Sequence, residues 1–159
     1  MTFYTMGVYG LAEEEFFEKL QKNKIDTFVD IRRRRAVRGS QYAFANSKRL
    51  QNRLSALGIH YIHVLELSPT NEIRKMQYAE DEKSGASQRS RESLSKVFIS
   101  AYERQILKKY SLKDLMNTLE KLDSKRALLF CVEKNPNACH RSIVAGKLQQ
   151  AYNVNVINL

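Results

Sequence analysis

The sequence contains very little cysteine and no long hydrophobic run. Only two cysteines, Cys131 and Cys139, occur among its 159 residues. A small secreted scaffold carries more of them, in pairs that staple its loops, so we expect both to be free thiols. No apolar run approaches the ~18 residues that a membrane-spanning helix requires. We therefore expect a soluble globular protein with no membrane partner.

The start of the chain also lacks the features of a targeting segment. Residues 1–6 (MTFYTM) have no basic region, no long apolar segment and no small-residue cleavage site. A signal peptide or a transit peptide would show such features. The expected location of the protein is therefore the cytoplasm.

The length and the charge of the chain set two further expectations. A chain of 159 residues has the usual size of one domain, which we place at 1–159. Its 27 Lys and Arg residues exceed its 17 Asp and Glu residues by ten. Such an excess attracts phosphates and acidic partners. It is equally typical of a merely basic, well-solvated surface, so the positions of the charges must decide.

Apolar runs alternate with helical patterns along the chain. Short runs of apolar, β-branched and aromatic residues predict strands, and apolar residues at helical spacing predict helices between them. Strands separated by helices imply parallel pairing through right-handed crossovers. We therefore predict a three-layer α/β domain with a mainly parallel sheet of about five strands flanked by helices. The predicted strands are 3–6, 27–31, 59–65, 127–131 and 154–159, and the predicted helices lie near 12–21, 50–57, 94–102, 112–122 and 140–152.

The segment between the third and fourth predicted strands has turn and loop chemistry. Residues 68–71 (SPTN) predict a turn followed by a helix cap. Residues 80–91 are polar and have no apolar period, so we expect a mobile loop or a frayed helix end there. Helical spacing then resumes and places Val97 and Phe98 on the same face as Leu94.

The carboxyl ends of the predicted strands are where we expect a site, because loops and helix N-termini converge there in parallel sheets. Gly7 follows the first strand and would let a ligand approach the backbone, although a tight turn also explains it. No Walker lysine accompanies it, so there is no nucleotide fingerprint. Asp30 and Arg32 end the second strand with their side chains on one face. An ion pair of Asp30 with Arg32 or Arg141 is the structural alternative to a role in a site.

A run of arginines follows the second strand, and an acidic residue follows the third. Residues 32–38 (RRRRAVR) contain more guanidinium groups than one ion pair needs, and Arg38 ends the run. Arginine forks suit phosphate and single-stranded nucleic acid, for which Tyr42 and Phe44 would supply stacking faces. Such a run is also typical of a solvated loop. Glu66 lies between two leucines, where a carboxylate is unfavourable unless it has a partner or a task.

The densest polar group surrounds the end of the fourth predicted strand. Cys131 and Glu133 follow that strand, and Cys139, His140 and Arg141 open the next helix. A helix N-terminus binds anions and favours the thiolate form of a cysteine. We favour the interpretation that Arg141 and the helix amides hold a phosphate or a carboxylate.

Three alternatives remain open for the same group. Cys139 could act as a nucleophile, although adjacent residues on a helix do not face each other, so that a base other than His140 would be needed. The Cys, Glu and His side chains could bind a metal, but their spacing matches no standard zinc pattern, and we predict no metal site. The cysteines could also simply pack in the core, while Arg141 neutralises a carboxylate.

The motifs resemble, in their order along the chain, domain-of-unknown-function family 488. They are TMGVYG at residues 5–10, VDIR at 29–32, HVLEL at 63–67, CVE at 131–133 and CHRS at 139–142. The resemblance implies a compact α/β fold with clustered motif residues, a family typical of prokaryotes, and no settled activity. The characteristic positions that it implies are Gly7, Asp30, Arg32, Phe44, Glu66, Cys131, Glu133, Cys139, His140 and Arg141.

These residues lead to three hypotheses about function. The first is an enzyme that acts on a phosphate-bearing ligand, a nucleotide or nucleic acid, in a strand-end pocket. The second is a non-catalytic nucleic-acid-binding module whose polar cluster is structural. The third is a thiol-dependent enzyme that uses Cys139. For the first hypothesis the predicted catalytic residues are Asp30, Glu66, Glu133, Cys139 and His140, and the predicted anion-binding residues are Gly7, Arg32, Arg38 and Arg141.

Overall fold

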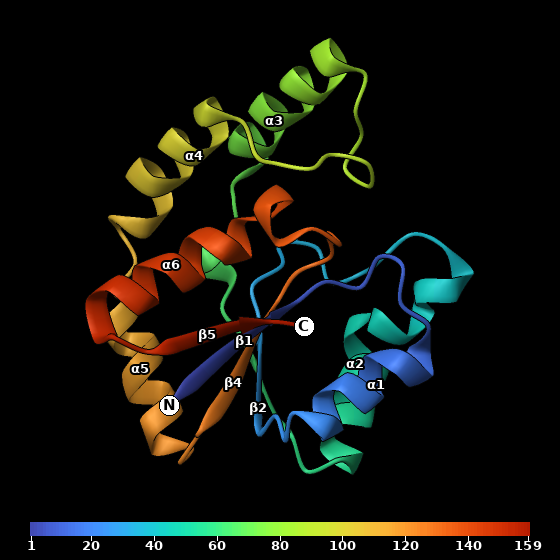
Figure 1. Cartoon of the computed structure of the whole chain (residues 1–159), viewed down its shortest axis with the longest axis vertical. Helices are drawn as coiled ribbons and strands as arrows, with labels where there is room; N and C mark the ends of the chain where they lie inside the picture. Colours follow the sequence, from blue (N-terminus) through green and yellow to red (C-terminus); the bar gives the residue numbers. More distant parts are fainter.

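The computed structural model describes residues 1–159 and contains one five-stranded sheet (Figure 1). All paired strands are parallel, and their order is β3-β2-β4-β1-β5. This sheet confirms the predicted α/β fold with a parallel sheet of about five strands. The strands are β1 (Thr2–Met6), β2 (Thr27–Asp30), β3 (His60–His63), β4 (Arg126–Phe130) and β5 (Asn155–Asn158).

Helices cover both faces of the sheet and complete the three layers. The helices are α1 (Glu13–Lys22), α2 (Ser47–Ala56), α3 (Asn71–Ser84), α4 (Lys96–Tyr102), α5 (Leu112–Lys121) and α6 (His140–Tyr152). The first two pack on one face, and α5 and α6 pack on the other. The pair α3 and α4 extends beyond one end of the sheet, at the top of Figure 1. None of these helices has the length and apolar character that a bilayer crossing needs.

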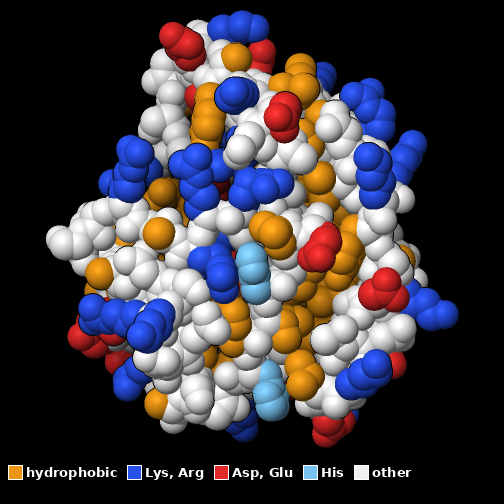
Figure 2. All heavy atoms as spheres, turned by 180° about the vertical axis from the view of Figure 1, so that it is seen from behind, with side chains coloured by type: hydrophobic (Ala, Val, Ile, Leu, Met, Phe, Trp, Pro, Cys, Tyr) orange, Lys and Arg blue, Asp and Glu red, His pale blue; other side chains and the backbone are white.

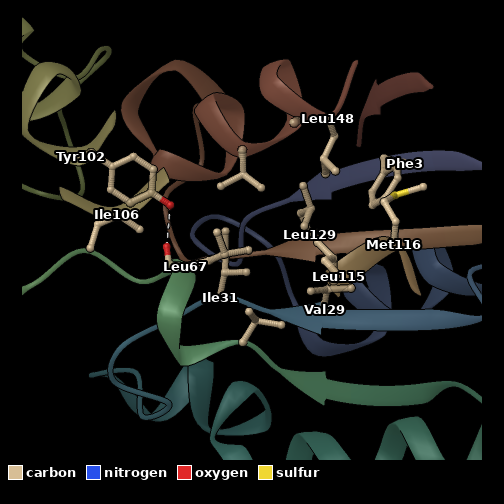
Figure 3. Close-up of a cluster of buried hydrophobic side chains, with 14 of the residues drawn as sticks. Phe3, Val29, Ile31, Leu67, Tyr102, Ile106, Leu115, Met116, Leu129 and Leu148 are labelled. Carbon is tan, nitrogen blue, oxygen red and sulfur yellow. Dashed lines mark hydrogen bonds between the residues drawn. The ribbon is translucent and has the colours of Figure 1, made fainter. Parts of the chain in front are cut away.

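The alternation of side chains along the strands divides the core into two halves. Phe28 packs with α1 and α2, and the next residue, Val29, packs with the helices of the opposite face. Figure 3 shows this second half, in which the buried Tyr102 hydroxyl of α4 donates a hydrogen bond to the Leu67 carbonyl. That bond ties α4 to the turn after β3 and so fixes the α3 and α4 pair above the end of the sheet.

The third strand is shorter than the sequence predicts. It ends at His63, and Leu65–Leu67 form a 3-10 turn instead of continuing the strand. Because this turn leaves the sheet, its middle residue, Glu66, is exposed to solvent and not enclosed between two buried leucines. Val97, which the spacing places on the same face as Leu94 and Phe98, is 52 % exposed, whereas those two residues are buried.

The polar stretch after residue 80 is helical for longer than the sequence predicts. α3 continues to Ser84 and ends at Gly85, which has a φ of 71° that favours glycine. Asp81 on its last turns is buried, accepts a hydrogen bond from Gln77 at 2.8 Å and lies 3.3 Å from the Arg91 guanidinium. A buried polar network therefore stabilises this segment, and no apolar period is needed. Thr70 caps the helix start as predicted, since its hydroxyl accepts the Ile73 N–H.

The loop after β1 lies directly against the loop after β4. The backbone N–H groups of Val8 and Tyr9 both donate to the Val132 carbonyl, at 3.0 and 3.1 Å. A Cβ atom added to Gly7 would lie 1.9 Å from the carbonyl oxygen of Glu133. No side chain fits at that separation, so Gly7 is needed for the packing of the two loops.

We predict that Gly7→Ala strongly destabilises the protein, because either backbone must move to admit the methyl group. The expected loss in the free energy of unfolding is roughly 3 kcal/mol or more, the upper end for an overpacked site. Gly146→Ala is the matched control, since an added Cβ meets nothing within 4 Å on α6, and it should stabilise by about 0.5–1 kcal/mol. Urea denaturation of both variants measures the difference. Equal free energies of unfolding for the two variants would contradict the close approach of Gly7 to the Glu133 carbonyl.

Candidate functional site

A cavity of about 550 Å³ opens beyond the carboxyl ends of β2 and β4, where the sequence predicts a site. Its walls come from the loops after these strands, from Tyr9 in the loop after β1, from α3 and from the segment that leads into α4. Glu133 is the one acidic side chain among the lining residues. The lining arginines are Arg32, Arg33, Arg34, Arg38, Arg74, Arg89 and Arg91.

Most of these arginines have no carboxylate partner. Only Arg32, which pairs with Asp30, and Arg91, which pairs with Asp81, form ion pairs, so five of the seven are left without one. Arg33, Arg34, Arg38 and Arg89 are exposed and Arg74 is half-buried, so they form a positive rim around the opening. Figure 2 shows Lys and Arg side chains gathered in a row across the face seen from behind. We call Arg33, Arg34, Arg38, Arg74 and Arg89 the arginine rim.

Asp30 and Arg32 form a buried ion pair beneath the cavity. The Arg32 guanidinium donates to both Asp30 oxygens, at 2.9 and 2.7 Å, and to the Ala45 carbonyl at 2.9 Å. The Tyr61 hydroxyl donates to the same carboxylate at 2.8 Å. Both charged side chains are thus occupied by protein partners. Of the two ion pairs that the sequence offered for Asp30, the one with Arg32 is present and the one with Arg141 is absent.

Arg141 holds backbone in place and does not line the cavity. Its side chain is 1 % exposed and donates to the carbonyls of Glu133 and Lys134 at 2.7 and 3.1 Å. A longer bond, at 3.4 Å, runs to the Thr5 hydroxyl of β1. Because its donors face protein acceptors, the expected role of Arg141 in holding an anion is not what the geometry shows.

Several other predicted residues lie away from the cavity. Gly7 is a packing residue, and Glu66 is exposed on its 3-10 turn outside the lining set. Phe44, which we expected to stack on bases, is 2 % exposed in the core beside Phe16. Arg38, by contrast, a residue predicted to bind an anion, lines the cavity. Gly7 after β1 and Glu66 after β3 therefore do not share the cavity with the predicted residues after β2 and β4.

The floor of the cavity brings together the two cysteines and His140. The Sγ atoms of Cys131 and Cys139 each lie 3.9 Å from Nδ1 of His140. Cys139 precedes α6 with extended backbone, at φ −137° and ψ 141°, so its side chain can fold back toward the next residue. The expectation that adjacent residues do not face each other fails here because it holds only inside a helix.

The imidazole of His140 is held in a defined tautomer. Its Nε2 atom lies 3.1 Å from the Ile31 carbonyl, which can only accept a hydrogen bond. Nε2 must therefore carry a proton, and in the neutral ring the lone pair of Nδ1 points at the two sulfur atoms. The ring is 5 % exposed, so this orientation is fixed by packing as well.

The titrating groups of the floor shift one another. The Cys139 hydrogen bond and burial raise the pKa of Cys131 well above its usual value. Burial alone would raise the pKa of Cys139, but the Cys131 hydrogen bond and the charges of Arg141 and His140 outweigh it, so that pKa lies well below its usual value. Burial and the neighbouring Cys139 raise the pKa of Glu133 to about 7.

Glu133 has one free carboxylate oxygen at the floor. Oε1 accepts a hydrogen bond from Gln88 at 3.0 Å, whereas Oε2 is buried and has no hydrogen-bond partner. A buried polar atom without a partner costs roughly 1–3 kcal/mol. An unmet acceptor of this kind inside a cavity indicates that a ligand or solvent atom is to be bound there.

The segment from Gly85 to Leu94 crosses the cavity as a strap, a role that its residues do not signal in the sequence. Gln88 bonds Glu133, while the Arg89 guanidinium lies 5.0 Å from the ring centre of Tyr9 and donates to the Arg38 carbonyl. The polar composition of residues 80–91 predicts a mobile loop or a frayed helix end instead. No sequence signal pairs Gln88 with Glu133, since 44 residues separate them in the sequence.

We predict that Arg141→Lys destabilises the protein although it keeps the positive charge. A lysine ammonium cannot reproduce the fork that binds two carbonyls and the Thr5 hydroxyl. The expected loss in the free energy of unfolding is on the order of 2 kcal/mol. Arg34→Lys on the exposed rim is the control and should change stability by less than about 0.5 kcal/mol. Urea denaturation measures both variants, and equal free energies of unfolding would argue against a structural role for the bonds of Arg141 to the two carbonyls.

The comparisons with known proteins agree with the resemblance seen in the sequence. No curated protein and no solved structure matches the chain significantly. The family model described as "Domain of unknown function DUF488" matches residues 12–148. This match covers most of the chain and includes the Asp30 and Arg32 motif and both cysteine motifs. The chain therefore belongs to the DUF488 family.

Proposed function

We propose that the protein is an enzyme that acts on a small phosphate-bearing ligand of the nucleotide type in the cavity beyond β2 and β4. In this proposal the arginine rim binds the phosphate, and Glu133 at the floor acts as general acid or base. The observation that carries it is the distribution of charge around the cavity: five arginines without carboxylate partners surround a single acidic side chain.

The arginine rim supports an anionic ligand on electrostatic grounds. Like charges gathered around one opening repel one another, and a cleft lined by one sign of charge concentrates ions of the opposite sign. Guanidinium groups match phosphate oxygens with two parallel bonds. Each charge-assisted hydrogen bond of this kind contributes roughly 1.5–3 kcal/mol. A phosphate would therefore relieve the repulsion and gain specific bonds at the same time.

The size and the aromatic lining support a nucleotide more than a long polymer. A volume of about 550 Å³ lies within the range of small-molecule pockets. Tyr9 lines the cavity, and its ring lies 5.4 Å from that of Tyr42, so two aromatic rings stand beside the arginines. A ligand that combines a phosphate with a flat base uses both features.

The geometry of Glu133 supports a role in proton transfer. Its bond from Gln88 fixes the carboxyl group, and its free oxygen is the acceptor that the floor leaves unused. A general acid or base has to lie within hydrogen-bond reach of the reacting group. Asp30 and Glu66 do not meet this condition, since one is bound by Arg32 and the other lies outside the cavity.

We predict that a mononucleotide or a sugar phosphate raises the melting temperature of the wild type, because a ligand that binds only the folded state stabilises it. A thermal-shift panel should also include inorganic phosphate and short single-stranded DNA and RNA, each at low and moderate salt. Arg38→Ala and Arg74→Ala should weaken binding by roughly 10-fold or more. Arg104→Ala is the control, because Arg104 is exposed and outside the cavity.

The outcomes of this panel separate the candidate functions. Stabilisation by the oligonucleotides alone, lost steeply with salt, would favour a nucleic-acid-binding module. Equal binding by the Arg38 and Arg104 variants would place the ligand elsewhere and contradict the proposal.

We further predict that Glu133→Gln binds the ligand found in this panel but loses turnover. Glutamine keeps the oxygen that accepts from Gln88, so the floor should retain its shape, while the removal of an acid or base slows the reaction by roughly 10²–10⁴-fold. Product formation is followed by chromatography under single-turnover conditions. Glu66→Gln is the matched control and should retain full turnover. Wild-type rates in Glu133→Gln would rule out its catalytic role.

A further inference from the structure

The floor of the cavity places three metal-ligating atoms around a common point. The distances from Nδ1 of His140 to both sulfur atoms are 3.9 Å, and all three atoms lie within 4.8 Å of one another. In a tetrahedral zinc site, bonds of about 2.3 Å to sulfur and about 2.0 Å to nitrogen put those atoms roughly 3.6 Å apart. A small contraction of the three side chains would therefore produce zinc geometry.

The orientation of His140 is that of a metal ligand. Its Nε2 donates to the Ile31 carbonyl, which leaves the lone pair of Nδ1 directed at the sulfur atoms. A histidine that binds a metal through one nitrogen commonly donates its other N–H to a backbone carbonyl, and that bond sets the tautomer and the ring plane. The carbonyl itself is held between Asp30 and Arg32, whose side chains are bonded to each other.

The two cysteines fit this role better than they fit a nucleophile or core packing. A nucleophile requires one sulfur atom, and the second sulfur at the same distance from the imidazole would then have no function. Both cysteines are buried, at 5 % and 1 % exposure, which hinders attack on a bulky substrate but suits an enclosed ion. An apolar core position also gives no reason for an imidazole nitrogen to point at two thiols.

An independent observation indicates where the fourth position lies. Glu133 lines the same cavity as Cys139 but is not one of the three converging groups. Its Oε2 atom is buried without a partner, and the residue lines the cavity together with both cysteines and His140. A water molecule or a ligand oxygen on a bound ion would supply the partner that this carboxylate oxygen lacks.

We propose that Cys131, Cys139 and His140 bind a divalent cation of the zinc type through Sγ, Sγ and Nδ1, with the fourth position open to the cavity. Three protein ligands and one open position are the arrangement of catalytic zinc sites. The cysteines bind as thiolates, so any protons that they carry pass to solvent, and two thiolates balance the charge of the ion. The site does not depend on the phosphate-bearing ligand of the preceding proposal.

The spacing of these ligands explains why no standard metal motif is visible in the sequence. Seven residues, 132–138, separate the cysteines, and His140 follows Cys139 directly. This order differs from the repeated pairs of standard zinc motifs. The three atoms meet only because the loop after β4 returns to the start of α6, where Arg141 binds the Glu133 carbonyl.

Cobalt titration of the full chain tests the proposal. The protein is stripped with a chelator under a thiol-free reductant and titrated with Co²⁺, whose thiolate charge-transfer band and tetrahedral visible bands report the ligands. We expect one Co²⁺ per chain, displaced by Zn²⁺. Cys139→Ser and His140→Gln should weaken binding by about 100-fold or more, since even the loss of outer-shell partners costs 10- to 100-fold. His63→Gln is the matched control, because that histidine bonds the Arg32 carbonyl outside the cluster.

Two measurements on the wild type keep the proposal testable if a variant fails to fold. X-ray absorption of the zinc-loaded protein should show two sulfur neighbours and at least one nitrogen, and Zn²⁺ should protect both thiols from iodoacetamide. Absence of a cobalt–thiolate band, a zinc shell without sulfur, or unprotected thiols would each overturn the proposal. Arg38→Ala should bind Co²⁺ like the wild type, so failure of the phosphate proposal and failure of the metal proposal are separate results.

Discussion

The buried guanidinium of Arg141 is the interaction on which the rest of the site depends. It lies on the first turn of α6 and reaches back to the carbonyls of Glu133 and Lys134 and to the Thr5 hydroxyl of β1. A buried cation without a carboxylate partner is unfavourable unless its donors are satisfied, so these bonds strongly oppose movement of the loop. Every candidate reactive group at the floor belongs to that loop or to the helix that follows it. Gly7 completes the constraint from the other side, because its lack of a side chain lets the two loops meet.

A buried ion pair supports the floor from the direction of β2. Asp30 and Arg32 bond each other and flank Ile31, whose carbonyl fixes the imidazole of His140. Both residues therefore act as positioning groups beneath the reactive ones. Such charges can lie in the interior because each is bonded at several points and not at one.

The rim and the floor of the cavity differ in rigidity and in chemistry. The floor is buried, and its groups are held by backbone bonds, whereas the rim consists mainly of exposed arginines on loops and on α3. Rigid groups suit a reaction or an ion, which require fixed geometry. Long exposed side chains suit a charged ligand that has to enter and leave. The strap from Gly85 to Leu94 joins the two regions, since Gln88 contacts the floor and Arg89 contacts the rim.

The sequence by itself determined the layers of the fold and the end of the sheet at which the cavity opens. Apolar runs such as 127–131 and the helix 140–152 were predictable because burial imposes a local period, and parallel connections follow from their alternation. The sequence also identified the loop after β4 as the densest polar group. It could not show that Glu66 leaves the sheet on an exposed turn, or that a polar helix continues to Ser84, because neither feature has an apolar period. Only the tertiary structure decided that Arg141 binds carbonyls and that Cys131, Cys139 and His140 converge, since these contacts depend on how the chain turns back on itself and not on residue spacing.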